Sequence, residues 1–149
     1  MKEIKKYAGC FVCGDMNDAG LKARFYYDGN QAVTEVEALA QFEGYQGVYH
    51  GGIISTLLDE VMIKALLADD KLALTAEISV RFFRPVKTGQ KMKFVGRLTH
   101  SKGRMFVTEG TAMSESGEVL ATATGKYIEA DETLRRALGV SGGGTRHQS

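Results

Sequence analysis

One segment of the chain follows the period of a helix, and strand-like patterns surround it. In residues 51–68, Ile54, Leu58, Val61 and Ala65 recur at spacings of three and four, which places them on one face of a helix. The 149 residues are enough for one domain with a sizeable core. The pattern therefore constrains the fold to one long helix among strands.

Strand signals occur on both sides of this helix. Residues 21–27 and 32–38 are separated by Asp28-Gly29-Asn30, a turn composition that predicts an antiparallel hairpin. Residues 75–84 alternate with a period of two, which puts Thr75 and Glu77 on one face of a strand and Ala76 and Ile78 on the other. Turn-forming pairs bound three further strands, predicted over 91–98, 104–113 and 119–129.

This order predicts an α+β fold, an antiparallel sheet of about six strands with one long helix on one face. One helix cannot cover such a sheet, and open sheet edges favour pairing with a second subunit. We therefore expect a homodimer or a homotetramer. The predicted organisation is an N-terminal segment over 1–20, the sheet-and-helix domain over 21–130, and a tail over 131–149 whose glycine-rich end is predicted to be disordered.

Composition narrows the class of partner. The 19 basic and 18 acidic residues leave a formal charge of +1, which does not favour nucleic acid or a charged membrane surface as a partner. Charged residues interrupt the apolar stretches, which fall short of the ~20 residues that a membrane span needs. The charged N-terminus lacks a following apolar run and predicts no secretory signal. We expect a cytoplasmic protein.

The chain has two cysteines, in the sequence Cys10-Phe11-Val12-Cys13. A tetrahedral zinc site needs about four ligands, and no second cysteine pair follows. A thioredoxin-like pair is expected at the end of a strand in a βαβ unit, whereas this one lies in a short N-terminal segment. We predict structural thiols that are dispensable for chemistry, and no metal site. A metal shared between subunits and a redox pair stay open as alternatives.

Two glycines, Gly51 and Gly52, begin the predicted helix. Without side chains, they let a ligand approach free backbone N–H groups at the positive end of the helix dipole. Such N–H groups suit an oxyanion or a polarised carbonyl oxygen. The alternative interpretation is a tight turn from loop to helix.

Two adjacent carboxylates on this helix are predicted to have different surroundings. At 100° per residue, Asp59 lies on a line with Met62 and Leu66 that flanks the apolar stripe. Glu60 points with Lys64 to the polar side, and we predict that it is a solvated surface charge. A carboxylate beside apolar side chains loses hydration, and function is the commoner reason for such a position.

The sequence His50-Gly51-Gly52-x6-Asp59 resembles the signature of the hotdog-fold acyl-CoA thioesterases of the phenylacetic-acid-degradation type. The resemblance implies that the Gly52 N–H polarises the thioester carbonyl and that His50 positions this region. It also implies that Asp59 acts as nucleophile or general base.

Other residues extend the resemblance. Thr75 stands ten residues before Pro85, at the place of a hydroxyl that orients the hydrolytic water. Many relatives carry Asn or Gln six residues before the histidine, where this chain has Gly44, so either Gln46 substitutes or Thr75 acts alone. Two further stretches are similar to the family: 81–86, and the opening Cys10-x2-Cys13-Gly14-x2-Asn17-x2-Gly20-Leu21.

The implied reaction is hydrolysis of acyl-CoA to free acid and coenzyme A, with no cofactor beyond the substrate. Four basic residues are the candidate ligands for the coenzyme A phosphates: Arg84, Lys87, Lys102 and Arg104. The alternative interpretation of each one is an ordinary surface charge. Gly51, Gln46 and Met62 are further candidates for contact with substrate. A non-catalytic acyl-CoA-binding domain and an acyl-thioester hydratase or dehydratase are the rival functions, and the acyl group stays open.

Overall fold

The computed structural model describes residues 1–139, and the predicted disordered end of the tail lies outside them. It contains seven strands and two α-helices, and a short 3-10 turn over Ala40–Phe42 precedes the first helix. The strands are β1 (Lys2–Glu3), β2 (Tyr26–Tyr27), β3 (Ala32–Glu37), β4 (Ala73–Phe82), β5 (Lys91–Lys102), β6 (Met105–Ser114) and β7 (Val119–Glu129). The helices are α1 (Gly51–Leu67) and α2 (Glu132–Ala137).

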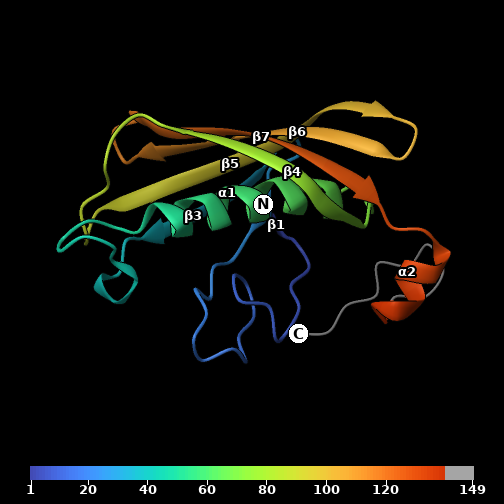
Figure 1. Cartoon of the computed structure of the whole chain (residues 1–149), viewed down its shortest axis with the longest axis horizontal. Coiled ribbons are helices and arrows are strands. Elements are labelled where there is room, and N and C mark those ends of the chain that lie inside the picture. Colours follow the sequence, from blue (N-terminus) through green and yellow to red (C-terminus); the bar gives the residue numbers. More distant parts are fainter. Residues whose placement is uncertain (140–149) are drawn as a thin grey trace.

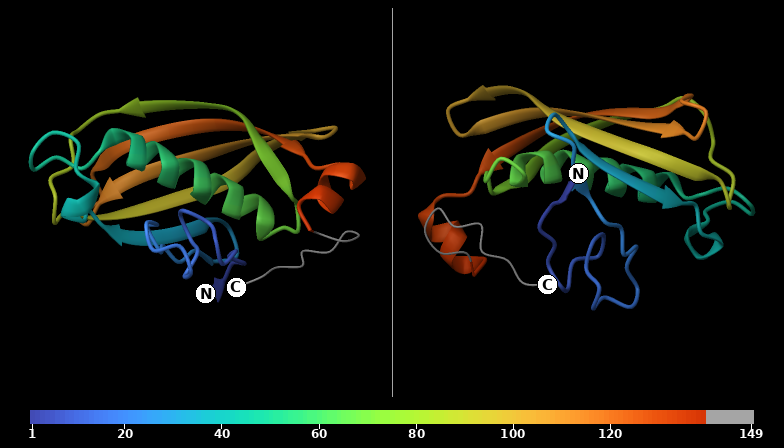
Figure 2. Two further views of the ribbon diagram at one scale, coloured as in Figure 1. Left: turned by 60° about the horizontal axis from the view of Figure 1, so that its bottom comes forward. Right: turned by 180° about the vertical axis from the view of Figure 1, so that it is seen from behind.

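The strands form one sheet in the order β1-β2-β3-β5-β6-β7-β4. Every neighbouring pair is antiparallel. Helix α1 lies along one face of the sheet, and the N-terminal segment covers the side of α1 that faces away from the sheet (Figures 1 and 2). The predicted α+β architecture is therefore confirmed, with β1 as an additional strand.

The predicted first hairpin exists but is shorter than expected. Strand β2 has two residues, although the strand-like pattern spans 21–27. The reason is that the N–H groups of Leu21 and Ala23 donate to carbonyls of the N-terminal segment, at Phe11 and Val12. Those backbone groups are therefore not available for a sheet ladder.

Close packing of α1 on the sheet depends on glycines in β5 and β6. Gly96 and Gly110 are paired across the two strands. A Cβ atom at Gly96 would lie 2.6 Å from the Val61 carbonyl oxygen, so only glycine permits this approach of helix backbone to strand. The four residues of the predicted apolar stripe, Ile54, Leu58, Val61 and Ala65, are all buried. The helical period thus identified the core-facing side of α1 correctly.

A β-bulge in β4 changes which face Thr75 occupies. The register between β4 and β7 shifts between Thr75 and Glu77, so that Thr75 pairs with Tyr127 and Glu77 with Lys126. Directly paired residues of antiparallel strands share a face, and bulges re-aim side chains in this way. The prediction that Thr75 and Glu77 share a face was therefore wrong, because strict alternation does not allow for the extra residue.

The prediction for Glu60 was also wrong. Its side chain is 15% exposed and that of Lys64 is 1% exposed, because the N-terminal segment packs over this side of α1. The Lys64 ammonium donates to the carbonyl oxygen of Lys5 and to Sγ of Cys13. Only tertiary packing of residues 50 to 60 positions away along the chain buries these two charged groups.

Part of the predicted tail is helical. Asp131 caps α2 by accepting a hydrogen bond of 2.8 Å from the Leu134 N–H through Oδ1, which is the usual role of Asp at a helix start. Within residues 1–139, no helix is long and apolar enough to cross a membrane.

Candidate active site

Two hydroxyl groups hold the Asp59 carboxylate at the edge of the sheet. The Thr75 hydroxyl and the Tyr127 hydroxyl each donate to Oδ1 of Asp59 at 2.9 Å. No described residue donates to Oδ2, so the second oxygen is available to a substrate or a water molecule. Because β4 is an edge strand, this carboxylate lies where another molecule can reach it. The structure thus brings together Asp59 and Thr75, two of the predicted site residues.

Sequence reasoning missed Tyr127. Its side chain is completely buried, and its ring lies over Gly125, where a Cβ atom would be 2.5 Å from Cε1 of the ring. Burial raises the pKa of the Tyr127 hydroxyl above its ordinary value, and the nearby Asp59 raises it further. The group is therefore a neutral hydrogen-bond donor. The sequence does contain one signal for it. Tyr127 follows Ala121, Ala123 and Gly125 at alternate positions of β7, and it is the only large side chain with a polar tip among these four.

At the start of α1, the imidazole of His50 is the N-cap. Its Nδ1 accepts a hydrogen bond of 2.9 Å from the Gly52 N–H, so the N–H group predicted to polarise a carbonyl has an acceptor within the chain. The Gly51 N–H has no acceptor among residues 1–139. His50 is exposed, so the start of α1 is accessible from solvent.

Three positions considered for contact with substrate or with the attacking water differ in their surroundings: Gly44, Gln46 and Met62. A Cβ atom at Gly44 would lie 3.3 Å from Cδ2 of His50, so the absence of a side chain there makes room for the imidazole. Gln46 is exposed and makes no described hydrogen bond. Met62 is completely buried and lies under Gly110. Of the two predicted substrate contacts, Gln46 is accessible from solvent, whereas Met62 is part of the core of the single chain.

The four basic candidates do not form one patch. Arg84 forms a salt bridge of 3.0 Å with Glu118 near the end of the sheet where α1 begins, and Lys87 follows it on the same loop. Lys102 is the last residue of β5 and Arg104 lies in the turn that follows it, at the opposite end of the sheet, where Arg104 donates to the Glu129 carbonyl oxygen. The eleven residues of β7 separate the two ends by on the order of 30 Å. One chain cannot place all four residues on one coenzyme A molecule.

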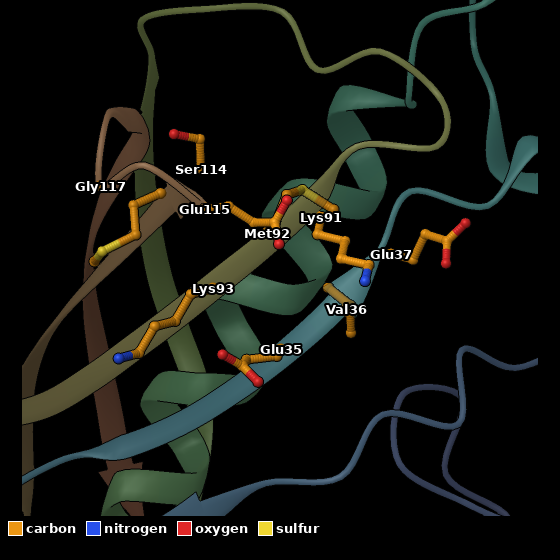
Figure 3. Close-up of a pocket in the computed structure, with 10 residues that line it drawn as sticks. Glu35, Val36, Glu37, Lys91, Met92, Lys93, Ser114, Glu115 and Gly117 are labelled. Carbon is orange, nitrogen blue, oxygen red and sulfur yellow. The ribbon is translucent and has the colours of Figure 1, made fainter.

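Two surface hollows adjoin the helix start. One of about 570 Å³ is lined by residues 43–45 and 48–51, including His50 and Gly51. Another of about 340 Å³ is lined by Gly51, Phe82 and residues that follow β4. A larger hollow of about 650 Å³ lies over β3 and β5, lined by Glu35, Glu37, Lys91 and Lys93 among others (Figure 3). It contains none of the predicted site residues.

The chemistry of this arrangement follows from its geometry. Asp59 is an oriented carboxylate with one free oxygen, which suits nucleophilic attack or abstraction of a proton from water. The helix start offers N–H groups to an oxygen that gains negative charge. The two features are seven residues apart on α1, or roughly 10 Å along its axis. One carbonyl group cannot contact both within a single chain.

Comparison with known proteins gives a family and relatives for this chain. The sequence model of the Thioesterase superfamily matches residues 46–121, which include the helix start, Asp59 and Thr75. An uncharacterised protein of Schizosaccharomyces pombe is 26% identical over 107 residues, which are 68% of this chain and 61% of that protein. The chain therefore spans less than two thirds of that relative.

Two solved structures have the same fold. The thioesterase superfamily protein RHA08564 has a TM-score of 0.76 at 24% identity, over 81% of this chain and 60% of its own. A hypothetical thioesterase of Streptococcus pneumoniae TIGR4, crystallised with coenzyme A, has a TM-score of 0.69 at 16% identity, over 72% of this chain and 88% of its own. The chain belongs to the thioesterase superfamily and has its hotdog fold.

Proposed function

We propose that this protein hydrolyses acyl-CoA thioesters to the free acid and coenzyme A, with Asp59 as nucleophile or general base. The observation that carries the proposal is the Asp59 carboxylate, which Thr75 and Tyr127 hold through one oxygen while the other stays free. The presence of coenzyme A in the streptococcal thioesterase supports the substrate class. Membership of the superfamily supports the reaction.

In the proposed reaction, the carbonyl oxygen of the thioester accepts a hydrogen bond from the Gly52 N–H. This step requires the His50 side chain to turn away, because its Nδ1 occupies that N–H. The free Gly51 N–H is adjacent and can share the developing charge. One hydrogen-bond donor to a developing oxyanion typically raises the reaction rate about 10²- to 10³-fold.

The proposed site is completed by a second copy of the chain. A carbonyl group held about 3 Å from both an N–H donor and a carboxylate cannot bridge the roughly 10 Å between Gly52 and Asp59 of one helix. Strand β4 offers an unpaired edge, and Leu74 and Phe82 on it are 46% and 49% exposed. Pairing along this edge would bury both and would bring the Gly52 of one subunit towards the Asp59 of its partner.

For the coenzyme A phosphates, Arg84 and Lys87 are the proposed ligands near the helix start. Both are exposed and adjoin the hollow that Gly51 and Phe82 line. Lys102 and Arg104 can serve the same ligand only if they come from another subunit. Gln46 is proposed to approach the substrate from the loop before His50.

The test is a hydrolysis screen over short, medium, long-chain and aryl acyl-CoAs, with release of free thiol as the readout. Asp59→Asn removes the charge but keeps the shape, and it should lower turnover by at least ~10²-fold while acyl-CoA still binds in a calorimeter. Asp18→Asn, at an exposed position in the N-terminal segment, is the matched control. Near-normal turnover of Asp59→Asn would refute the assignment. Tight binding without hydrolysis by the wild-type protein would instead indicate the acyl-CoA-binding alternative.

A further inference from the structure

A second cluster of reactive groups lies between α1 and the N-terminal segment, on the other side of the helix from the sheet. It consists of Cys10, Cys13, Glu60 and Lys64. The two Sγ atoms and a carboxylate oxygen of Glu60 all lie within 4.8 Å of one another. Nothing in the proposed hydrolysis uses these groups.

The two thiols have unequal surroundings. Cys10 is partly exposed, and its Sγ accepts hydrogen bonds of 3.4 Å from the N–H groups of Val12 and Cys13. Cys13 is buried, and its Sγ lies 3.4 Å from the Lys64 ammonium. Hydrogen bonds from backbone N–H groups and a nearby cation stabilise a thiolate, and the partly exposed cysteine can also meet a reagent from solvent.

The pKa values of the cluster have the same asymmetry. The hydrogen bond with Cys13 lowers the pKa of the Cys10 thiol to about 5, against the effect of its burial. The hydrogen bond with Cys10, together with burial, raises the pKa of the Cys13 thiol above its ordinary value. Burial raises the pKa of Glu60 to about 7. Tyr7 also lies near Cys13: burial is the largest cause of its raised pKa, the charge of Cys13 adds to it, and Arg135 opposes it.

We propose that Cys10 and Cys13 form a redox-active dithiol, with Cys10 as the attacking thiol, Cys13 as the resolving thiol and Glu60 as the acceptor of the Cys13 proton. With a small disulfide such as oxidised glutathione, the Cys10 thiolate attacks one sulfur and releases one glutathione thiolate. Cys13 gives its proton to Glu60 and attacks Sγ of Cys10, which releases the second glutathione. The two cysteines lose two electrons, and the glutathione disulfide gains them.

The ammonium of Lys64 favours a dithiol over a metal site. Zinc bound to thiolates and a carboxylate at about 2.0 to 2.3 Å places neighbouring ligand atoms less than ~4 Å apart in a tetrahedron. Lys64 Nζ lies 3.4 Å from Cys13 Sγ and 3.8 Å from the Glu60 Oε2, so a cation already stands beside two of the three candidate metal ligands. An ammonium group has no lone pair for a metal, but it does stabilise thiolates and a carboxylate.

The test uses the full chain, equilibrated without oxygen in mixtures of reduced and oxidised glutathione, quenched with acid and measured by mass spectrometry. The wild-type protein should lose two hydrogens and form a Cys10–Cys13 disulfide that dithiothreitol reverses. Cys13→Ser should accumulate a mixed disulfide of Cys10 with glutathione, and Cys10→Ser should remain unmodified over the same time. A wild-type protein that forms no internal disulfide, or a Cys10→Ser variant that reacts as fast as Cys13→Ser, would overturn the proposal.

Two further measurements do not depend on variants. The rate of alkylation of Cys10 should change less than ~2-fold between pH 6.5 and 8.5, because the thiolate already dominates, whereas a free thiol of pKa ~8.5 should react roughly 50-fold faster at the higher pH. A profile like that of the free thiol would contradict the proposal. Zinc in a one-to-one ratio in the purified protein, with both thiols protected from alkylation until a chelator is added, would identify a metal site instead.

Discussion

Replacing Glu60 by Gln tests whether the burial of this carboxylate shapes the pH dependence of stability. Burial is the largest cause of its raised pKa, the Cys10 thiolate adds to it, and the Lys64 ammonium opposes it. The pKa rises from 4.5 to about 7. Between these two values the folded protein keeps a proton that the unfolded chain has lost. The free energy of unfolding therefore falls as the pH rises through this interval.

The magnitude follows from the width of the interval. At 1.36 kcal/mol per pH unit, the free energy of unfolding falls by about 3 kcal/mol over these roughly 2.5 pH units. This loss is absent below pH 4.5 and complete above pH 7. Gln cannot ionise, so Glu60→Gln does not show this loss. The variant should gain about 3 kcal/mol relative to the wild-type protein between pH 4.5 and 8.

Urea denaturation of both proteins at several pH values in this range measures the difference directly. Glu115→Gln, at an exposed position in the turn between β6 and β7, is the matched control and should leave the pH dependence unchanged. In a Cys10→Ser background the gain should be smaller, since one of the groups that raise the pKa is absent. A difference between Glu60→Gln and wild type that stays constant across the pH range would refute this account of Glu60.

Three other outcomes are expected. Tyr127→Phe removes a hydrogen bond to the Asp59 carboxylate, so kcat/KM should fall about 10-fold and the free energy of unfolding by about 1 to 2 kcal/mol; unchanged kcat/KM would show that this hydroxyl does not position Asp59. Gly96→Ala should destabilise the fold by about 1 to 3 kcal/mol in urea titrations, since its Cβ meets the Val61 carbonyl oxygen at 2.6 Å, whereas Gly9→Ala, with nothing within 4 Å, should have little effect. Light scattering should give at least twice the mass of one chain, and Leu74→Lys on β4 should lower both that mass and the turnover; a monomeric, active wild-type protein would exclude a site shared between subunits.

The sequence was sufficient to predict most of the architecture. Helix α1 was expected over 51–68 and spans Gly51–Leu67, because its apolar spacing and its glycine start are local signals. The four strands after it were also located, since turn-forming pairs bound each one. The short β1 and the capped α2 were missed, because two-residue pairings and six-residue helices carry little periodic signal.

For the candidate site, the sequence alone predicted Asp59 and its place beside the apolar stripe. It could not identify Tyr127 as the partner, because that contact joins residues 68 positions apart. It also placed Thr75 on the wrong face, since a β-bulge depends on the pairing between strands and leaves no mark on the alternation of one strand.

The contrast between Asp59 and Glu60 has the same origin. A helical projection states which residues share a face, and it correctly separated the two carboxylates. It cannot state what covers that face. The N-terminal segment covers Glu60 and Lys64, whereas the open edge at β4 leaves one oxygen of Asp59 free. Periodicity is a property of the chain, but burial depends on which distant segment packs against each side, and only the tertiary structure determines that.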